Sequence, residues 1–279
     1  MLVTWSRERG ASVSRVTGSA THPRPSSAAS QTAAASELDR SELPPSAPEL
    51  SAIVLCYRAE GSILKVIEPL FEQLRSSGLA HELILVANHD GTGRDRTPAI
   101  VREFAQARSP FVRAVIRQKK GGMGWDMRSG FEAARGEYMV VIDGDAQNPV
   151  EDLLAAYRRM KDSGVAVIKG RRTARFDSAY RRVVSGAYNS LFRLVFRTGE
   201  LWDINGKPKG LTRAAYEQLE LRSDDWFIDA EIVIAARRKQ LTIGELPVVF
   251  HRNDDRASFV RPAAIGEFLA NMARERVGR

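Results

Sequence analysis

The segment Tyr138-Met-Val-Val-Ile-Asp143-Gly-Asp145-Ala-Gln147-Asn-Pro149 decides the fold of this 279-residue chain. Its apolar run, bounded by charged and turn-forming residues, predicts a buried parallel strand. Asp143 and Asp145 end that strand two positions apart, so their side chains share one side if the extended geometry continues. Asn148 is expected to cap a helix that starts at Pro149. The acidic pair is therefore predicted at a strand-to-helix crossover, where open α/β sheets bind ligands.

Two carboxylates on one side of a strand end offer hard oxygen ligands. Such ligands suit Mg²⁺ or Mn²⁺, and the ion in turn neutralises a diphosphate. The alternative is an ordinary solvated loop, because Asp-x-Asp after a strand also occurs by chance. The segments on either side of this motif are needed to decide between the two interpretations.

The composition is that of a globular protein of one large or two small domains, since 43% of the residues are hydrophobic. A single cysteine, Cys56, excludes an intramolecular disulfide framework and a Cys-rich zinc site. It stands in an apolar run and is expected to be a small buried hydrophobic residue. The four histidines show no spacing typical of metal ligands.

No apolar run approaches the roughly 18 to 20 residues that cross a bilayer. The N-terminus also lacks the apolar core and small-residue cleavage site of a signal peptide. We therefore expect a cytoplasmic protein, either soluble or peripheral on the inner face of the plasma membrane.

Positive charge is concentrated in one part of the chain. The formal net charge is +8, and residues 158–213 alone hold 14 Lys/Arg and 4 Asp/Glu, a net charge of +10. Such a region suits nucleic acid, anionic lipid or a phosphorylated substrate. A nucleic-acid partner fits poorly, because the basic residues lack a recognition motif and an aromatic stacking pattern.

Strand-like and helix-like segments alternate from residue 51. This alternation predicts an α/β fold with a mostly parallel central sheet, right-handed crossovers and flanking helices in a single domain. The expected strands are residues 52–57, 82–86, 111–116, 138–142, 165–168 and 241–250, and the expected helices are residues 62–74, 98–107, 127–134, 153–160, 180–196 and 226–238.

The chain is expected to have three parts. Residues 1–48 are rich in Ser, Ala and Pro and lack apolar periodicity, so they are predicted to be a disordered tail. Residues 49–260 are predicted to form the globular domain, and residues 261–279 a C-terminal helical extension. The sequence leaves open whether the tail belongs to the native protein, and it leaves the oligomeric state open.

Three segments along the domain match known motifs in order. Leu55-Cys-Tyr57-Arg-Ala-Glu60 stands where family 2 glycosyltransferases have Pro-Thr-Tyr-Asn-Glu-Glu. Lys120-Gly-Gly-Met-Gly124 resembles their Lys-Gly-x-Gly segment, and Asp143-Gly-Asp145-Ala-Gln147 resembles their Asp-x-Asp-x-Gln. With two further segments on the acceptor side, the chain resembles family 2 glycosyltransferases of the GT-A fold over about residues 51–260. The nearest branch is that of the dolichol- or polyprenyl-phosphate sugar transferases.

The resemblance implies a donor site for a nucleoside-diphosphate sugar. In that site Tyr57 and Glu60 lie against the nucleotide, and Lys120 lies near the donor. The metal and the donor diphosphate are held by Asp143, Asp145 and Gln147, with Mg²⁺ or Mn²⁺ as the cofactor. His251 and Arg252, at the end of the last strand, are expected to approach the donor phosphates.

One departure from the family pattern concerns the base and ribose. After the second strand the family has Asp-Asp-Gly-Ser, whereas this chain has Ala87-Asn88-His89-Asp90-Gly91-Thr92. Asn88 is expected to bond a base edge, and the carboxylate is either lost or displaced to Asp90. The identity of the nucleotide stays open, as does that of the sugar.

The resemblance also implies an acceptor-phosphate site. Lys169-Gly-Arg171-Arg172 stands where the family has Gly-Ser-Arg, and Arg181 and Ser185 resemble its Arg-x-x-x-Ser pair. At positions i and i+4 of a helix this pair shares a face and could grip one phosphate, although a solvated basic face is the usual alternative. Asn205, Lys207 and Lys209 are further candidate phosphate contacts, and an edge strand fits their segment too.

Two acidic residues resemble the late acidic motif of the family. Asp229 and Glu231 stand two apart, so on a helix only one of them is expected to enter the site. A hydroxyl acceptor would need one of them as general base, whereas a lipid phosphate is already anionic. Together with Asp145 they are the candidate catalytic residues. The helix of residues 180–196 is expected either to lie at a membrane interface or to face the core.

The predicted function is inverting sugar transfer from a nucleoside diphosphate, and the crowded arginines favour a polyprenyl phosphate as the acceptor. Two alternatives remain: transfer to a soluble hydroxyl acceptor, and a degenerate, non-catalytic homologue that binds a nucleotide sugar.

Overall fold

The structure is a computed structural model that describes residues 47–175, 179–199, 201–251 and 263–277. Within these ranges, the side chains of residues 174–185, 263–265 and 267 lie outside the description. All described residues belong to the compact unit Arg40–Arg279. The predicted tail, residues 1–48, falls outside the described residues except for its last two positions.

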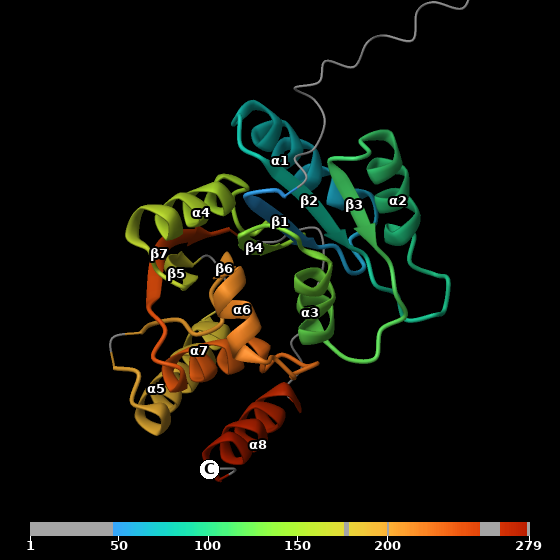
Figure 1. The fold of residues 1–279 in the computed structure, drawn as a ribbon. Helices are drawn as coiled ribbons and strands as arrows, with labels where there is room; N and C mark the ends of the chain where they lie inside the picture. Colours follow the sequence, from blue (N-terminus) through green and yellow to red (C-terminus); the bar gives the residue numbers. More distant parts are fainter. Residues whose placement is uncertain (1–46, 176–178, 200, 252–262, 278–279) are drawn as a thin grey trace, which may run out of the picture. The chain divides into compact units, whose positions relative to one another are not determined.

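A seven-stranded sheet forms the centre of the described unit, in the order β3-β2-β1-β4-β6-β5-β7 (Figure 1). Neighbouring strands run parallel except at β6, which is antiparallel to both β4 and β5. The strands are β1 (Leu50–Leu55), β2 (His81–Val86), β3 (Val112–Val115), β4 (Tyr138–Asp143), β5 (Val167–Arg175), β6 (Lys209–Thr212) and β7 (Ile243–Phe250).

Helices connect the strands and cover both faces of the sheet. They are the short 3-10 helix η2 (Glu60–Ile63), α1 (Leu64–Ser76), α2 (Thr97–Ala107), α3 (Met123–Ala133), α4 (Glu151–Ser163), α5 (Ala179–Phe196), α6 (Arg213–Leu219), α7 (Ile228–Arg238) and α8 (Ala263–Val277). The predicted mostly parallel sheet with flanking helices is therefore confirmed.

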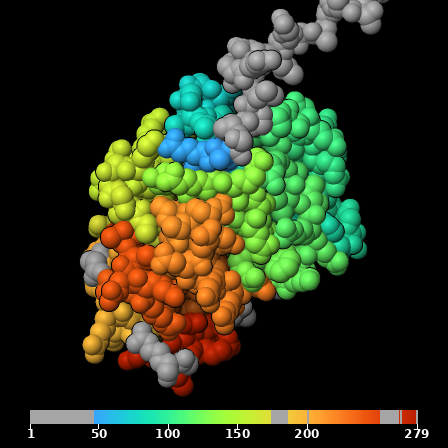
Figure 2. All heavy atoms as spheres, in the orientation of Figure 1, coloured from blue at the N-terminus to red at the C-terminus, as the bar shows by residue number. Residues whose placement is uncertain are grey.

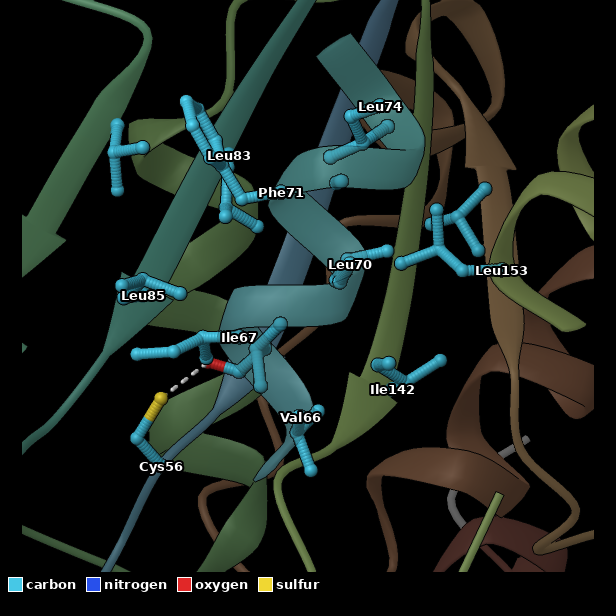
Figure 3. Close-up of a cluster of buried hydrophobic side chains, with 14 of the residues drawn as sticks. Cys56, Val66, Ile67, Leu70, Phe71, Leu74, Leu83, Leu85, Ile142 and Leu153 are labelled. Carbon is cyan, nitrogen blue, oxygen red and sulfur yellow. Dashed lines mark hydrogen bonds between the residues drawn. The ribbon is translucent and has the colours of Figure 1, made fainter. Parts of the chain in front are cut away.

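Alternation along the strands divides the core between the two faces. Ala52 and Val54 of β1 pack with α1, α2 and α4, whereas Ile53 and Leu55 pack with α3, α6 and α7. Figure 3 shows the first of these clusters, in which Cys56 is buried and its Sγ lies 3.4 Å from the Val54 carbonyl oxygen. The cysteine is thus the small buried residue that the sequence predicts. Each fully buried Leu or Ile side chain contributes about 1.5 to 3 kcal/mol.

A third apolar cluster lies away from the sheet and joins α5, α7 and α8. Phe192 of α5 is fully buried in it, together with Phe227, Val233 and Met272. Figure 2 shows the C-terminal segments packed directly against the segment that carries α3, in agreement with the backbone hydrogen bonds between residues 122–125 and 224–225. The loop before α7 is therefore fastened to the start of α3.

The strand order reverses between β1 and β4. From β1 the chain moves outward to β2 and β3, and it then returns to place β4 on the other side of β1. The carboxyl ends of β1 and β4 are level, because Leu55 pairs with Asp143. In open α/β sheets, ligands bind in the crevice outside the carboxyl ends of the strands at such a reversal.

Two local predictions need correction. The strand β4 ends at Asp143 and the chain then turns, so the extended geometry does not continue to Asp145. Helix α4 begins at Glu151 with Val150 as its N-cap, so the prediction of Asn148 as the cap was wrong. The side chain of Asn148 instead donates a hydrogen bond to the Lys207 carbonyl oxygen at 3.0 Å.

The strand β6 was not predicted, nor was α6. The segment that starts at Lys209 is not an edge strand, because β6 lies between β4 and β5. A four-residue strand that contains Gly210 carries almost no pattern of its own. Glycine is required there, because an added Cβ would lie 2.6 Å from Met160 Sδ and 2.9 Å from Ile168 Cγ2.

Candidate active site

The turn after β4 places the two predicted carboxylates at the strand reversal. The Gly144 amide donates to the Leu55 carbonyl oxygen at 2.9 Å, which ties the turn to the end of β1. An added Cβ at Gly144 would lie 2.6 Å from Ile63 Cδ1 and 2.7 Å from Leu55 O, so a larger residue does not fit. Asp143 and Asp145 flank this glycine and are both half-buried. A tight turn, rather than a continuing strand, brings them to one edge of the sheet.

Gln147 and His251 hold this turn against the end of β7. The His251 amide donates to the Gln147 carbonyl oxygen at 2.8 Å, and the Gln147 side-chain amide donates back to the His251 carbonyl oxygen at 2.9 Å. The Gln147 amide in turn donates to Asp145 Oδ1 at 3.1 Å. The structure thus brings together Asp145, Gln147 and His251, which the sequence placed in one donor site from positions about 100 residues apart.

The loops after β1 and β2 are tied to each other. Arg58 forms an ion pair with Asp90, and the Glu60 carboxylate accepts the Arg96 amide at 3.2 Å. The Glu60 amide donates to Thr97 Oγ1 at 2.7 Å. The Thr92 hydroxyl and amide together with Arg58 lower the pKa of Asp90 below its usual range. The predicted nucleotide contacts Glu60 and Asp90 therefore lie in one rigid pair of loops, beside Tyr57.

Asn88 lies inside the protein and not at a ligand surface. Its side-chain amide donates to Asp126 Oδ1 at 2.9 Å, and its carbonyl oxygen accepts the Arg117 amide at 2.9 Å. It is fully buried, so in this conformation its side chain supports the neighbouring residues of the site and is not accessible to a base. Lys119 forms an ion pair with the same Asp126.

Sequence reasoning missed Lys119 and Asp126. A usable signal was present, because Asp126 stands beside Met127 on a helix whose apolar face was expected to be buried. A carboxylate at such a position needs a partner. The lysines at 119 and 120 were the nearest candidates along the chain.

The glycines near Lys120 have a structural use in this conformation. The Gly122 and Gly124 amides donate to the carbonyl oxygens of Asp224 and Asp225, at 2.6 and 3.0 Å. An added Cβ at Gly124 would lie 2.4 Å from the Ser223 carbonyl oxygen. The close backbone approach that these glycines allow is thus made by the loop before α7. Lys120 itself is exposed, with its Nζ 5.5 Å from the Trp125 ring centroid.

The residues at the turn after β4 fit a divalent metal. No group of three or more His, Cys, Asp or Glu side chains converges among the described residues. Asp143 and Asp145 would supply two hard oxygen ligands and not a complete protein cage. Mg²⁺ is usually held in this way, by one or two carboxylates with substrate phosphates and water completing the shell.

On the acceptor side, Arg172 already forms an ion pair with Asp203. Its Nε donates to Asp203 Oδ2 at 2.6 Å, its amide donates to the same oxygen at 3.0 Å, and a further guanidinium nitrogen pairs with Oδ1. Both partners are largely buried. Arg171 is exposed and lies 5.5 Å from the Trp202 ring centroid. Of the two predicted arginines, Arg171 is the exposed one, and its guanidinium lies 4.0 Å from Glu245 Oε2.

Lys207 and Lys209 form a buried ion cluster with Asp229. Lys207 Nζ lies 2.7 and 2.8 Å from the two Asp229 carboxylate oxygens, and Lys209 Nζ lies 2.9 Å from Asp229 Oδ1. Burial lowers the pKa of Lys209 to about 8, and the two ammonium groups keep the pKa of Asp229 below its usual value despite burial. In this conformation neither lysine is exposed to a phosphate and Asp229 is not exposed to a hydroxyl.

Glu231 and Asn205 also have local structural settings. The Glu231 carboxylate accepts the amides of Arg222 and Ser223, both at 2.9 Å, and so fastens the loop that contacts the glycine segment. Asp229 and Glu231 indeed lie on different faces of α7. Asn205 is half-buried in the turn before β6. The side chains of Arg181 and Ser185 lie outside the described residues, as does Arg252.

Neither of the two best-formed cavities of the described unit coincides with this site. One, of about 190 Å³, lies between α6, α7 and α8, and the other, of about 500 Å³, is lined by residues 47–49, 135–137 and Arg213. No described helix combines the length and apolar character needed to cross a membrane.

Two groups of curated relatives are similar to the chain. Glycosyltransferase AglD of Haloferax volcanii is 28% identical over 220 residues, covering 76% of this chain and 35% of that protein. The undecaprenyl-phosphate 4-deoxy-4-formamido-L-arabinose transferase of Pseudomonas paraeruginosa is 31% identical over 140 residues, covering 50% of this chain and 40% of that protein. The chain thus spans well under half the length of these relatives.

Solved structures share the fold. Glucosyl-3-phosphoglycerate synthase of Mycobacterium tuberculosis, in complex with Mn²⁺, UDP and glucosyl-3-phosphoglycerate, superimposes with a TM-score of 0.61 at 18% identity, covering 83% of this chain and 80% of that chain. The predicted GT-A fold is confirmed. The family model described as Glycosyl transferase family 2 matches residues 51–219, more than half of the chain. The chain therefore belongs to glycosyl transferase family 2.

Proposed function

We propose that this protein transfers a sugar from a nucleoside diphosphate to a polyprenyl phosphate, with inversion at the anomeric carbon and with Mg²⁺ or Mn²⁺ at the donor diphosphate. The observation that carries the donor half is the placement of Asp143 and Asp145. Both are half-buried, and they stand at the end of the central strand where the strand order reverses. When bound there, the ion would stabilise negative charge on the leaving diphosphate.

The reaction exchanges one bond to the anomeric carbon for another. An oxygen of the acceptor phosphate forms a bond to that carbon as its bond to the diphosphate oxygen breaks. The nucleoside diphosphate leaves with the electron pair. The loops tied by Arg58–Asp90 hold the nucleotide, and Gln147 with His251 holds the turn beneath the diphosphate. Such pre-organised positioning supplies much of the catalysis in group transfer.

The setting of Asp229 supports an acceptor that is already ionised. A hydroxyl acceptor needs a general base within hydrogen-bond reach of its proton. Asp229 is buried, bonded to two lysines and held at a lowered pKa, so it is a weak base. Glu231 is occupied by two backbone amides. A phosphate monoester acceptor is anionic near neutral pH and requires no such base.

A basic apolar surface supports an acceptor in a membrane. On the outer side of α5, Leu191 and Leu194 are 39% and 78% exposed, and Trp202 is 47% exposed. The Arg193 guanidinium lies 4.2 Å and that of Arg171 5.5 Å from the Trp202 ring centroid. We infer that the exposed residues Leu191, Leu194 and Arg197 form one surface with Trp202 and with the two arginines at its ring, Arg171 and Arg193. Exposed apolar residues interleaved with arginine suit the interface of an anionic bilayer.

Helix α5 was expected either to face the core or to lie at a membrane interface, and each expectation has support from a different face of the helix. Phe192 is buried against α7, while the face of Leu191 and Leu194 points outward. Among the relatives, the Pseudomonas transferase is named for a polyprenyl-phosphate acceptor, which agrees with this proposal.

A transfer assay tests the proposed reaction. Radiolabelled sugar nucleotides are incubated with Mn²⁺, protein and either a short polyprenyl phosphate or soluble hydroxyl acceptors. Label is expected in the organic phase only with the polyprenyl phosphate. Asp145→Asn is expected to abolish the transfer, and Asp162→Asn, an exposed carboxylate on α4, is the matched control.

Other outcomes favour the alternatives. Transfer confined to water-soluble acceptors would exclude the lipid half of the proposal. Donor binding without turnover, unchanged in Asp145→Asn, would favour a non-catalytic nucleotide-sugar binder.

Flotation with vesicles tests the membrane surface. Protein is expected to float with vesicles that contain phosphatidylglycerol and to stay behind with pure phosphatidylcholine. Arg197→Glu is expected to weaken flotation, whereas Arg102→Glu, an exposed arginine on α2, is expected to leave it unchanged. Equal loss in both variants would point to net charge and not to this surface.

A further inference from the structure

A lysine lies over the aromatic ring at the end of β1. Lys119 follows β3, and its Nζ lies 4.1 Å from the Tyr57 ring centroid. Its ammonium also forms an ion pair with Asp126 of α3. Three elements thus bring these side chains together, at the carboxyl edge of the sheet beside the strand reversal.

The backbone and side chain of Lys119 are both held in place. The Lys119 amide donates to the His89 carbonyl oxygen at 2.8 Å, and Asn88 accepts the amide of the nearby Arg117 at 2.9 Å. Asn88 also donates to Asp126 Oδ1 at 2.9 Å, which orients the carboxylate that holds the ammonium. The rotamer entropy that a ligand would otherwise have to remove from this lysine is already lost.

The two side chains of the Lys119–Asp126 ion pair differ in their exposure. The Lys119 side chain is 11% exposed, whereas that of Asp126 is 4% exposed. Burial raises the pKa of Asp126, and the Lys119 ammonium opposes that rise. The carboxylate therefore lies beneath and the ammonium lies nearer the surface. A ligand at the Tyr57 ring meets a donor and not an acceptor.

The carboxylates of these loops accept hydrogen bonds from the protein: Glu60 from the Arg96 amide, and Asp95 from the Arg58 and Thr97 amides. Asp90 is bonded to Arg58 and to Thr92. Among the charged groups near Tyr57, Lys119 is thus the donor that lies against the ring itself. An ammonium carries three donors and no acceptor.

We propose that Lys119, positioned by Asp126 and Asn88 against the Tyr57 ring, recognises the nucleobase of the donor by the carbonyl at pyrimidine position 4 or purine position 6, and so selects uracil, thymine or guanine over cytosine and adenine. This inference rests on the proposed function, because it assigns the base to a nucleotide-sugar site. Thymine O4, its counterpart in uracil, and guanine O6 accept hydrogen bonds, whereas cytosine N4 and adenine N6 donate them. An ammonium that faces an amino group leaves two donors opposed and unpaired.

Equilibrium binding of nucleoside diphosphates tests the proposal on the full chain. Dissociation constants are measured by titration calorimetry with Mn²⁺ for UDP, CDP, GDP, ADP and inorganic pyrophosphate. UDP and CDP differ at the ring positions in question and share the ribose and diphosphate. We expect UDP to bind about 10- to 100-fold more tightly than CDP, and GDP more tightly than ADP by a similar factor.

Variants assign the selectivity to Lys119. In Lys119→Met the ratio between UDP and CDP is expected to fall close to one, while pyrophosphate binds as in the unmodified protein. Because this variant leaves Asp126 without its ion pair, Lys119→Met/Asp126→Asn provides a second form without a buried uncompensated charge. Lys119→Arg keeps the donors and is expected to keep the preference. Lys239→Met, at the exposed end of α7, is the matched control.

The outcomes separate this inference from the proposed function. Equal affinity for UDP and CDP in the unmodified protein, with pyrophosphate bound, overturns the role of Lys119 and leaves the proposed function intact. A preference that persists in both Lys119 variants overturns it as well. Absence of binding by every diphosphate, pyrophosphate included, overturns the proposed function together with this inference.

Discussion

Lys207 Nζ donates to both carboxylate oxygens of Asp229, at 2.7 and 2.8 Å, inside the interface between β6 and α7. Lys209 adds a second ammonium at 2.9 Å. One of the two candidate general bases and two predicted phosphate ligands thus neutralise one another within the fold. The Asn148 side chain bonds the Lys207 carbonyl oxygen, so this cluster adjoins the turn that carries Asp143 and Asp145.

Removing one charged side chain from the cluster of Lys207, Lys209 and Asp229 is expected to destabilise the folded protein. Lys207→Met is expected to lower the free energy of unfolding by about 3 to 5 kcal/mol, because it leaves Asp229 with half of its compensation in a buried site. Urea unfolding followed by circular dichroism measures the change, and exposed Lys239→Met serves as the control. A loss below about 1 kcal/mol would show that the pair is solvated in solution.

Glu82 is a second buried carboxylate, at the opposite end of the sheet. It accepts hydrogen bonds from Ser51 at 2.7 Å, from Arg113 at 2.9 Å and from the Arg135 amide at 2.7 Å. Glu82→Gln keeps the shape and removes the charge, so it is expected to destabilise the protein by about 1.5 to 3 kcal/mol. Thermal unfolding of this variant beside Glu72→Gln, an exposed carboxylate on α1, checks the prediction. Equal melting temperatures would refute it.

Two helical glycines should respond to alanine with opposite signs. An added Cβ at Gly124 meets the Ser223 and Asp225 carbonyl oxygens at 2.4 and 2.7 Å, so Gly124→Ala must displace the loop before α7. Gly186 in α5 has nothing within 4 Å, and Gly186→Ala is expected to stabilise by about 0.5 to 1 kcal/mol. Differential scanning calorimetry compares the two. A stabilising Gly124→Ala would mean that the loop contact is absent in solution.

The metal proposal predicts that variants which lose the ion also lose affinity for the donor nucleotide. Asp143→Asn and Asp145→Asn are each expected to weaken Mn²⁺-dependent UDP binding by at least about tenfold, since a carboxylate ligand to a divalent cation is removed. Chelation with EDTA should reduce UDP binding of the unmodified protein to the same level and leave the variants little changed. A variant that binds UDP normally and still responds to EDTA would place the ion elsewhere.

Asp152 should make stability depend on pH. Burial raises its pKa to about 6 from the model-compound value of 3.8. The folded state therefore binds more protons than the unfolded state between these values, and stability falls as the pH rises through this window. Asp152→Asn is expected to remove that loss and so to raise the free energy of unfolding at pH 7.5 by roughly 1 kcal/mol, with solvent screening allowed for. Urea unfolding at pH 4.5 and 7.5 compares the two proteins; parallel changes in both would refute the assignment.

Much of the donor half of the fold could be predicted because its strands and helices depend on residues that lie close together in the sequence. Apolar runs bounded by turn residues marked β1, β2 and β4, and the periodicity of Leu153, Tyr157 and Met160 marked α4. The alternation of these strands with helices implies parallel strands joined by right-handed crossovers. Residues at the carboxyl ends of adjacent strands meet for that reason alone, so Tyr57, Asp143 and Asp145 could be grouped before any coordinates were known.

The acceptor half was harder to predict, because its lysines were interpreted from their charge. Charge alone does not distinguish a lysine that meets a ligand from one that neutralises a buried carboxylate. Lys207, Lys209 and Arg172 turned out to have carboxylate partners 22, 20 and 31 residues away. The same ambiguity hid Lys119, whose partner Asp126 is buried by packing of α3 against the sheet.

The sequence by itself determined the strand–helix alternation, the position of two carboxylates after the β4 strand and the local excess of positive charge. These depend on periodicity and on residue type within a few positions. Only the tertiary structure decided which charges cancel one another and which remain at the surface. The physical reason is that an ion pair depends on distance and burial, and both are set by strands and helices that lie far apart in the chain.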